Sequence, residues 1–294
     1  MKGLTFASHY ASEMDSRETL YPLFERVFDI PVEVLKDFYA RGFWDPTYCP
    51  YTFFDGTRAV ANASCFTLEL QLGGQRVKAA GIQSVMTHPD YRNRGLMRQL
   101  CEQMLVDLDQ RFPTCWLFTD SPELYTPFGF RVVPQYAFVA EYSHDGDPEA
   151  QLRQIDFQQE QDVRLVRECF VDHQPISQTF APVGYESSFF LHMYSPDFQS
   201  YVHYSERLQA IIVFAVKEQT LHLYDIIGKQ LPSWTELCTE IPEPFSRVTL
   251  HFCPDQFADR VFTPILYDGG GKLMVRGQLS QEQSHLRMSM TAAF

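Results

Sequence analysis

The stretch Gln83–Leu100, QSVMTHPDYRNRGLMRQL, decides the fold because its pattern changes from strand to helix within a few residues. The strand pattern ends at Pro89, and a helical pattern follows with apolar residues at four-residue steps: Leu96, Leu100, Met104 and Leu108. A strand, a basic glycine-containing turn and a helix in this order direct unpaired backbone N–H groups and the positive end of a helix dipole to one place. This arrangement indicates a site for an anion.

The same turn carries Arg92, Arg94 and Arg98, although the net charge of the whole chain is −13. Arginine forms bidentate hydrogen bonds to phosphate oxygens, and helix N-termini favour negative charge. Three arginines and several N–H groups suit a pyrophosphate better than a single carboxylate. We therefore expect an anionic cofactor at this turn.

The composition excludes several classes of protein. With 294 residues, of which 45% are hydrophobic and 21% charged, the chain is expected to form about two folded domains. The acidity argues against nucleic-acid and membrane partners, and the sequence lacks a long apolar run and a signal-peptide core. The seven cysteines include no C-x-x-C, and the histidines show no metal-ligand spacing. We expect buried, reduced thiols, no metal and a cytoplasmic protein.

The periodicity along the chain predicts a mixed α/β fold of the α+β type. In the first half we expect helices over 17–28, with Ser16 as N-cap, and over 33–41 after Pro31. The sequence pattern predicts strands over residues 51–54, 58–72, 76–87 and 114–119. We expect a helix over 95–109 and a short helix or turn over 121–127. Phe130–Val133 and Tyr136–Tyr142 are expected to pair and close the sheet.

The polar segment 143–150 is the expected linker, which divides the chain into domains 1–145 and 150–294. The second half repeats the α/β order of the first. Helices are expected near 160–171 and 233–240, and strands near 200–205, 208–216, 220–227, 246–252, 261–266 and 272–276. Residues 268–271, Asp-Gly-Gly-Gly, are expected to form a hairpin turn between the last two strands. His88 is expected at the surface.

Two segments resemble a known family. Residues 92–97, Arg-Asn-Arg-Gly-Leu-Met, resemble the acetyl-CoA signature of GNAT superfamily N-acetyltransferases, Arg/Gln-x-x-Gly-x-Gly/Ala. Residues 124–130, Leu-Tyr-Thr-Pro-Phe-Gly-Phe, resemble the superfamily's Tyr-x-x-x-Gly-Phe segment. Met97 stands where the signature usually has a small residue. The form Tyr-Arg-x-Arg-Gly-Leu-Met-Arg is similar to the corresponding motif of the Eis-like branch (enhanced intracellular survival acetyltransferases). This resemblance implies tandem GNAT-like domains, of which 1–145 is catalytic. The other, 150–294, resembles the branch's degenerate GNAT-like domain in residues 221–228, 248–257 and 272–277, and without an Arg-x-x-Gly turn it is not expected to bind acetyl-CoA.

The resemblance also implies residue roles, with acetyl-CoA as co-substrate. Tyr125 would be the general acid that protonates the departing CoA sulfur. Ser121 would lie near the cofactor. Residues at the end of the strand and along the turn would bind it: Val85, Met86, Thr87, Arg92, Asn93, Arg94, Gly95, Leu96, Met97 and Arg98. Longer Eis-like enzymes place the carboxylate of a third domain in the site, and this chain is expected to stop before that domain. The base is left open between solvent, a carboxylate in the cleft and Phe294.

Two functions follow as expectations. The first is acetyl transfer to a primary amine, which could be a cationic small molecule or a peptide; polyamines, aminoglycosides, and lysine or N-terminal amines stay open. The alternative is a catalytically inactive acyl-CoA-binding or regulatory module of the same fold. A homo-oligomer is left open.

Overall fold

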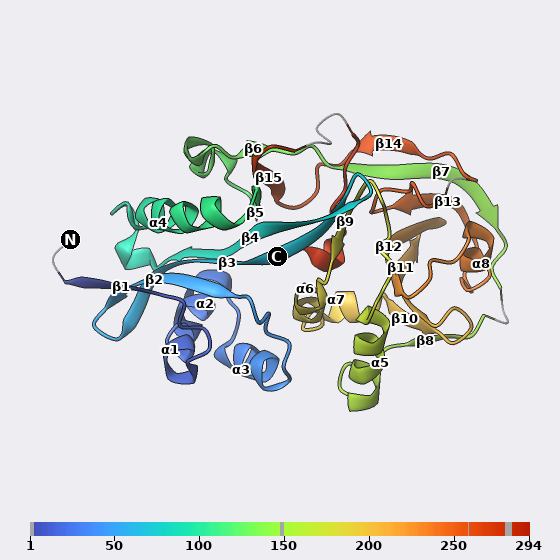
Figure 1. The fold of residues 1–294 in the computed structure, drawn as a ribbon. Helices are drawn as coiled ribbons and strands as arrows, with labels where there is room; N and C mark the ends of the chain where they lie inside the picture. Colours follow the sequence, from blue (N-terminus) through green and yellow to red (C-terminus); the bar gives the residue numbers. More distant parts are fainter. Residues whose placement is uncertain (1–2, 148–149, 258, 280–283) are drawn as a thin grey trace.

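The computed structural model describes residues 3–147, 150–257, 259–279 and 284–294, and it contains two mixed β-sheets with helices on their faces (Figure 1). This architecture confirms the expected mixed α/β class. The first part of the chain forms β1 (Leu4–Ser8), α1 (Met14–Glu18), α2 (Tyr21–Phe28), α3 (Val32–Ala40), β2 (Cys49–Asp55), β3 (Arg58–Leu72), β4 (Gln75–Thr87), η1 (Pro89–Tyr91), α4 (Leu96–Arg111), β5 (Thr114–Thr119), η2 (Pro122–Leu124), η3 (Thr126–Phe128), β6 (Arg131–Val132) and β7 (Tyr136–His144).

The second part continues with strands and short helices. Its elements are β8 (Leu152–Gln154), α5 (Glu160–Phe170), β9 (Phe180–Val183), α6 (Glu186–His192), α7 (Pro196–Gln199), β10 (Val202–Ser205), β11 (Ala210–Lys217), β12 (Thr220–Gly228), α8 (Trp234–Cys238), β13 (Phe245–Leu250), β14 (Thr263–Leu266), β15 (Lys272–Gly277) and η4 (Met290–Ala292).

The first sheet has the order β1-β2-β3-β4-β5-β15-β6, with β9 paired to β3. Among the strand pairs described for this sheet, only β4 and β5 run parallel, as expected for strands joined by the crossover helix α4. The apolar positions that predicted α4 are buried against the sheet, and α4 covers one face while α2 and α3 cover the other (Figure 1).

The second sheet has the order β14-β7-β13-β12-β11-β10-β8. Its central strands are apolar and fully enclosed. Of the pairings that the described residues form here, only that of β12 with β13 is parallel. The two sheets therefore share one plan, in which a long antiparallel pair leads into one parallel pair.

The sheets exchange strands along the chain. β7 joins the second sheet, whereas β9 and β15 join the first, so the expected pairing of Phe130–Val133 with Tyr136–Tyr142 is wrong. β15 takes that place because its apolar centre, Leu273–Val275, is buried as a strand enclosed on both faces requires. The expected hairpin at residues 268–271 is also wrong, since β14 and β15 lie in different sheets. The boundaries 1–145 and 150–294 stay a prediction, and the sheets do not follow them.

The helix expected over 17–28 is two helices. Pro22 lies in the first turn of α2, where its missing N–H costs no hydrogen bond, and this favours a new start over continuation. Ser16 lies inside α1 and donates to Glu13, so its expected role as N-cap is wrong. Pro31 is the N-cap residue of α3, as its position in the sequence predicts.

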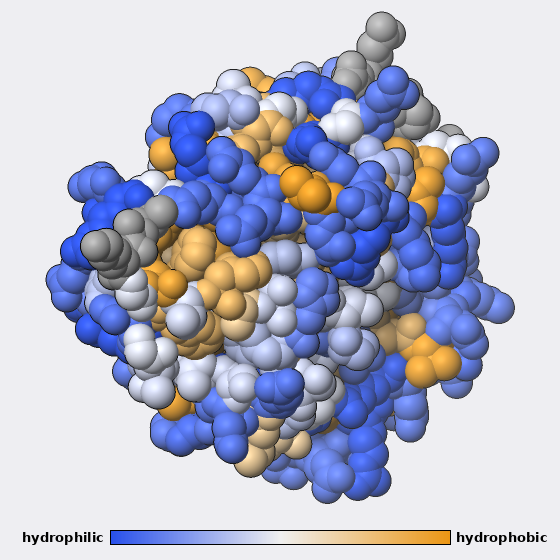
Figure 2. Space-filling view, turned by 60° about the vertical axis from the view of Figure 1, so that its left-hand side comes forward, coloured by the Kyte–Doolittle hydropathy of each residue, from blue (hydrophilic) through white to orange (hydrophobic). Residues whose placement is uncertain are grey.

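Polar side chains cover most of the molecular face in Figure 2, and a smaller apolar area lies in a hollow of that face. All seven cysteines are free and buried, as expected. Within the described residues, every helix is too short or too polar to cross a bilayer.

Candidate active site

The turn before α4 adopts the backbone conformation of an anion site. Asn93 and Gly95 both have left-handed backbone angles, with φ of 62° and 72°. Gly95 is the N-cap residue and supplies no side chain to cap the helix. The first N–H groups of α4, from Leu96 to Arg98, therefore have no intrahelical acceptor and point toward the turn.

A groove of about 360 Å³ lies over this turn. The second motif forms its other wall through Leu124, Pro127 and Phe128, and Glu123 is the carboxylate among its lining residues. Seven of the predicted binding residues line it: Thr87, Arg92, Asn93, Gly95, Leu96, Met97 and Arg98.

The three arginines of the turn differ in their contacts. Arg92 and Arg98 are exposed at the groove; Arg92 donates to the carbonyl of Thr87 at 3.3 Å. Arg94 instead donates to the carbonyl of Asp90 at 2.7 Å and lies over the Tyr91 ring. Arg94 therefore braces the turn, while Arg92 and Arg98 present charge to the groove.

Four other predicted residues are absent from the groove wall. Tyr125 is buried against α4, and burial raises the pKa of its hydroxyl. Ser121 is the N-cap residue of η2, and its N–H donates to the Thr119 hydroxyl at 3.0 Å. Val85 packs on the α4 face and Met86 on the α2 face, as alternation along a strand requires.

The parallel strands β4 and β5 separate beside these residues. Their pairing ends at Ile82 with Leu117, although β4 continues to Thr87. A bulge interrupts β3–β4 pairing at the same level, and Ser84 takes a left-handed φ of 54°. The strands therefore leave a gap in the sheet whose edge, at residues 83–87, carries backbone groups free of β5.

A chain of buried polar side chains supports this bulge. Asn62 donates to the carbonyl of Ser84 and to the Ser64 hydroxyl, each at 2.8 Å, and accepts from Thr52 at 2.7 Å. Ser64 in turn donates to the Tyr48 hydroxyl at 2.7 Å. Because buried polar groups are costly when unpaired, this satisfied network fixes the bulge in one conformation.

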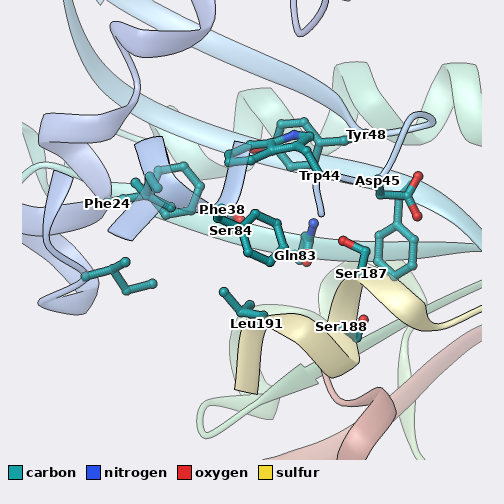
Figure 3. A pocket seen from close by; sticks show the side chains of 13 residues that line it. Phe24, Phe38, Trp44, Asp45, Tyr48, Gln83, Ser84, Ser187, Ser188 and Leu191 are labelled. Atoms are coloured by element: carbon teal, nitrogen blue, oxygen red, sulfur yellow. The ribbon is translucent and has the colours of Figure 1, made fainter. Parts of the chain in front are cut away.

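A second cavity, of about 70 Å³, meets β4 at Gln83 and Ser84 from the opposite face of the sheet (Figure 3). Its wall comes from α2, α3, the following loop with Trp44, Asp45 and Tyr48, and α6 of the second half of the chain. The groove on the α4 face and this cavity on the α2 face thus approach the same stretch of β4.

Phe294 forms part of the surroundings of this cavity. Its ring makes edge contacts with Phe66 on β3 and Phe118 on β5, with centroid distances of 4.9 and 5.7 Å. Phe66 lies across Gly81, where a Cβ atom would come within 2.4 Å of the ring. The last described residues therefore meet the first sheet beside the cavity, near the middle of the molecule (Figure 1).

The expectation of a surface His88 is wrong. Its side chain is buried, lies 2.6 Å from a guanidinium nitrogen of Arg58 and accepts from the N–H of Asp90 at 3.2 Å. Burial and Arg58 lower its pKa. His88 thus stabilises the start of the turn through its contacts with Arg58 and the backbone of Asp90.

The second sheet has a region that corresponds to the gap between β4 and β5, and residues 289–291 of the chain occupy it. Pairing of β12 with β13 ends at Leu223 with Leu250, and a bulge lies at the neighbouring β11–β12 register. There Ser289 donates to the carbonyl of Tyr224 at 3.0 Å, and Thr291 donates to the buried carboxylate of Asp225.

Sequence reasoning missed the residues of the second cavity. Trp44, Asp45 and Tyr48 lie in a loop without a motif, and Ser187 and Leu191 come from a helix more than a hundred residues away. The many aromatic residues near positions 38–48 could have indicated a cavity, but such residues are equally typical of a hydrophobic core.

Residues 11–133 match a family model described as an acetyltransferase (GNAT) domain. No curated protein sequence matches the chain.

Three solved structures are similar along most of their length. They are Eis1 from Mycobacterium abscessus (14% identity, TM-score 0.60, 92% of this chain and 73% of that chain), a probable N-acyltransferase from Enterococcus faecalis (13%, 0.58, 96% and 74%) and a GCN5-related N-acetyltransferase from Anabaena variabilis (16%, 0.57, 96% and 75%). At these identities the likeness concerns the fold. The chain therefore has a GNAT-like fold, and its residues 11–133 carry the match to a GNAT acetyltransferase domain.

Proposed function

We propose that this protein transfers an acetyl group from acetyl-CoA to a primary amine. The observation that carries the proposal is the pair of cavities on opposite faces of the first sheet: the groove is lined by Thr87 and the second cavity by Gln83 and Ser84, all in the part of β4 that lies beyond its pairing with β5. A cofactor in the groove could extend its thioester through this gap and meet an amine in the second cavity.

The groove supplies the groups that acetyl-CoA needs. Exposed Arg92 and Arg98, with the N–H groups that begin α4, suit the pyrophosphate. The backbone of Val85–Thr87 would bind the pantetheine, and an N–H of this segment would hydrogen-bond the thioester oxygen as negative charge develops there.

The reaction needs one bond to form and one to break. The amine nitrogen attacks the thioester carbon, the C–S bond breaks, and the thiolate takes a proton from the Tyr125 hydroxyl, which regains a proton from water. The ammonium of the intermediate loses its proton to water or to Asp45, the carboxylate among the cavity's lining residues. The buried, free cysteines support a reducing compartment such as the cytoplasm as the place of the reaction.

Calorimetric titration with acetyl-CoA tests the cofactor site. The double variant Arg92→Gln, Arg98→Gln should weaken binding about tenfold or more, because two charge-assisted contacts are lost. Arg164→Gln, which removes an exposed arginine from α5, is the matched control. Absence of binding by the wild type at millimolar acetyl-CoA contradicts the proposal.

Release of CoA with a panel of amines tests catalysis. Tyr125→Phe should lower kcat at least about tenfold and leave acetyl-CoA affinity unchanged, since general acid catalysis commonly contributes a hundredfold or more. Tyr142→Phe, a partly exposed tyrosine of the second sheet, is the control. Unchanged turnover removes Tyr125 from the acid role. Acetyl-CoA binding without amine-dependent CoA release favours the inactive module instead.

A further inference from the structure

The second cavity differs at its two ends. Figure 3 shows Asp45, Gln83 and Ser187 toward one end and Phe24 toward the other, with Phe38 and Trp44 between them. The lining is therefore polar where it meets β4 and the α6 serines, and apolar toward α2. A ligand that fits this lining has one polar end and one apolar end.

Aromatic side chains make the walls narrow. The ring of Trp44 stands edge-on to Tyr48 and to Phe38, with centroid distances of 5.2 and 5.8 Å. The cavity of about 70 Å³ is smaller than the apolar cavity of about 150 Å³ that, engineered into another protein, binds benzene. Such a space accepts a slender chain or the edge of one ring, and it excludes a saccharide.

The lining residues carry one negative charge. Asp45 accepts from the N–H and the hydroxyl of Thr47 through a single oxygen, at 2.7 and 2.6 Å, and these bonds hold the carboxylate in place. One carboxylate beside aromatic rings can balance one ammonium group, which the ring faces also attract. A second ammonium group farther along the cavity would be desolvated without a partner.

We propose, on the basis of the proposed function, that the acceptor is an apolar monoamine: one primary amine on a single alkyl or arylalkyl group. Its ammonium group is held by Asp45 before the proton leaves, and its apolar group extends between Trp44 and Leu191 toward Phe24. Polyamines and aminoglycosides fit the lining poorly, because they carry several charges and little apolar surface.

The test compares kcat/KM for hexylamine, phenethylamine, spermidine and kanamycin with acetyl-CoA, with products identified by mass spectrometry. The kcat/KM for hexylamine or phenethylamine should be at least about tenfold higher than for spermidine and kanamycin. The ratio of kcat/KM between hexylamine and phenethylamine distinguishes an alkyl from an arylalkyl group. Asp45→Asn should raise KM for the preferred amine about tenfold and leave acetyl-CoA affinity unchanged. Asp197→Asn, an exposed aspartate of α7, should change neither.

Leu191→Glu adds a second carboxylate to the cavity and should shift preference toward diamines such as 1,6-diaminohexane. Faster turnover of spermidine or kanamycin by the wild type, or unchanged KM in Asp45→Asn, overturns the inference and leaves the proposed function intact. Binding of acetyl-CoA without turnover of any amine overturns the proposed function, and this inference with it.

Discussion

Tyr125 is held in apolar surroundings between α4 and the end of β5, next to the ring of Phe130. Burial disfavours the charged phenolate and raises the pKa of this tyrosine above its usual value of about 10. The folded protein therefore keeps the hydroxyl protonated at pH values where an exposed tyrosine begins to ionise. Under the proposed function, the donor stays protonated as the pH rises, but its raised pKa also makes it a weaker acid toward the thiolate.

The pH dependence of kcat should reflect this shift. Because the pKa is raised, the acid form persists as pH increases, and kcat at saturating amine should show no alkaline decline up to about pH 9.5. The measurement is a kcat profile from about pH 6 to 9.5, on the wild type and Tyr125→Phe. An alkaline decline below about pH 9.5 that disappears in Tyr125→Phe would contradict the prediction.

Gly81 lies in β4 beneath the Phe66 ring, and its lack of a side chain permits that close approach. Gly81→Ala should displace Phe66 from the cavity wall, destabilise the protein by about 1–3 kcal/mol and raise KM for the amine. Acetyl-CoA affinity should stay unchanged, because the groove lies on the opposite face. Denaturant unfolding and steady-state kinetics measure these effects, and the second substitution Phe66→Leu should partly restore both. A wild-type KM in Gly81→Ala would show that Phe66 does not shape the cavity.

At the scale of elements, the strand–turn–helix unit at residues 83–100 was predictable because a motif, a periodicity change and charge all agree there. β3, β4, β5 and α4 have nearly the expected bounds. The placement of β15 was not predictable, since a short apolar run such as Leu273–Val275 does not reveal which sheet receives it. The second cavity escaped prediction for a similar reason: its walls come together only through the packing of α6 against the first sheet's helices.

The insertion of β15 depends on its last residue. Gly277 has a φ of 96°, and a Cβ atom there would lie 2.3 Å from the carbonyl oxygen of Pro113, just before β5. Gly277→Ala should therefore destabilise the protein by about 2 kcal/mol or more. Gly270→Ala is a matched control, because its φ is 69° but no atom lies within 4 Å of the added Cβ atom; its cost should be about 1 kcal/mol. Thermal unfolding of both variants measures these losses of stability. Equal losses in the two variants would contradict the proposed role of Gly277 in placing β15.

At the scale of the whole molecule, the two halves of the sequence do not correspond to two separate sheets. β7 belongs to the first half of the sequence but lies in the second sheet. β9 and β15 belong to the second half but lie in the first sheet. One hydrophobic core contains residues of both sheets, including Trp116 of β5 and Val213 of β11. Each sheet therefore depends on strands that the other half supplies.

This interdependence predicts a single unfolding transition. Differential scanning calorimetry of the full chain should give one peak, whose calorimetric and van't Hoff enthalpies agree. Separate fragments 1–145 and 150–294 should each fail to fold cooperatively, because each lacks strands of its own sheet. Two resolved transitions would show instead that the halves are independent.

The position of the two cavities has a kinetic consequence. The groove opens on the α4 face and the second cavity on the α2 face, so neither ligand has to pass the other on its way in or out. Under the proposed function, either ligand can then bind first, and acetyl-CoA bound without an amine keeps its thioester beside the polar end of the second cavity. The separation of the two entrances would thus allow a random order of addition through a ternary complex.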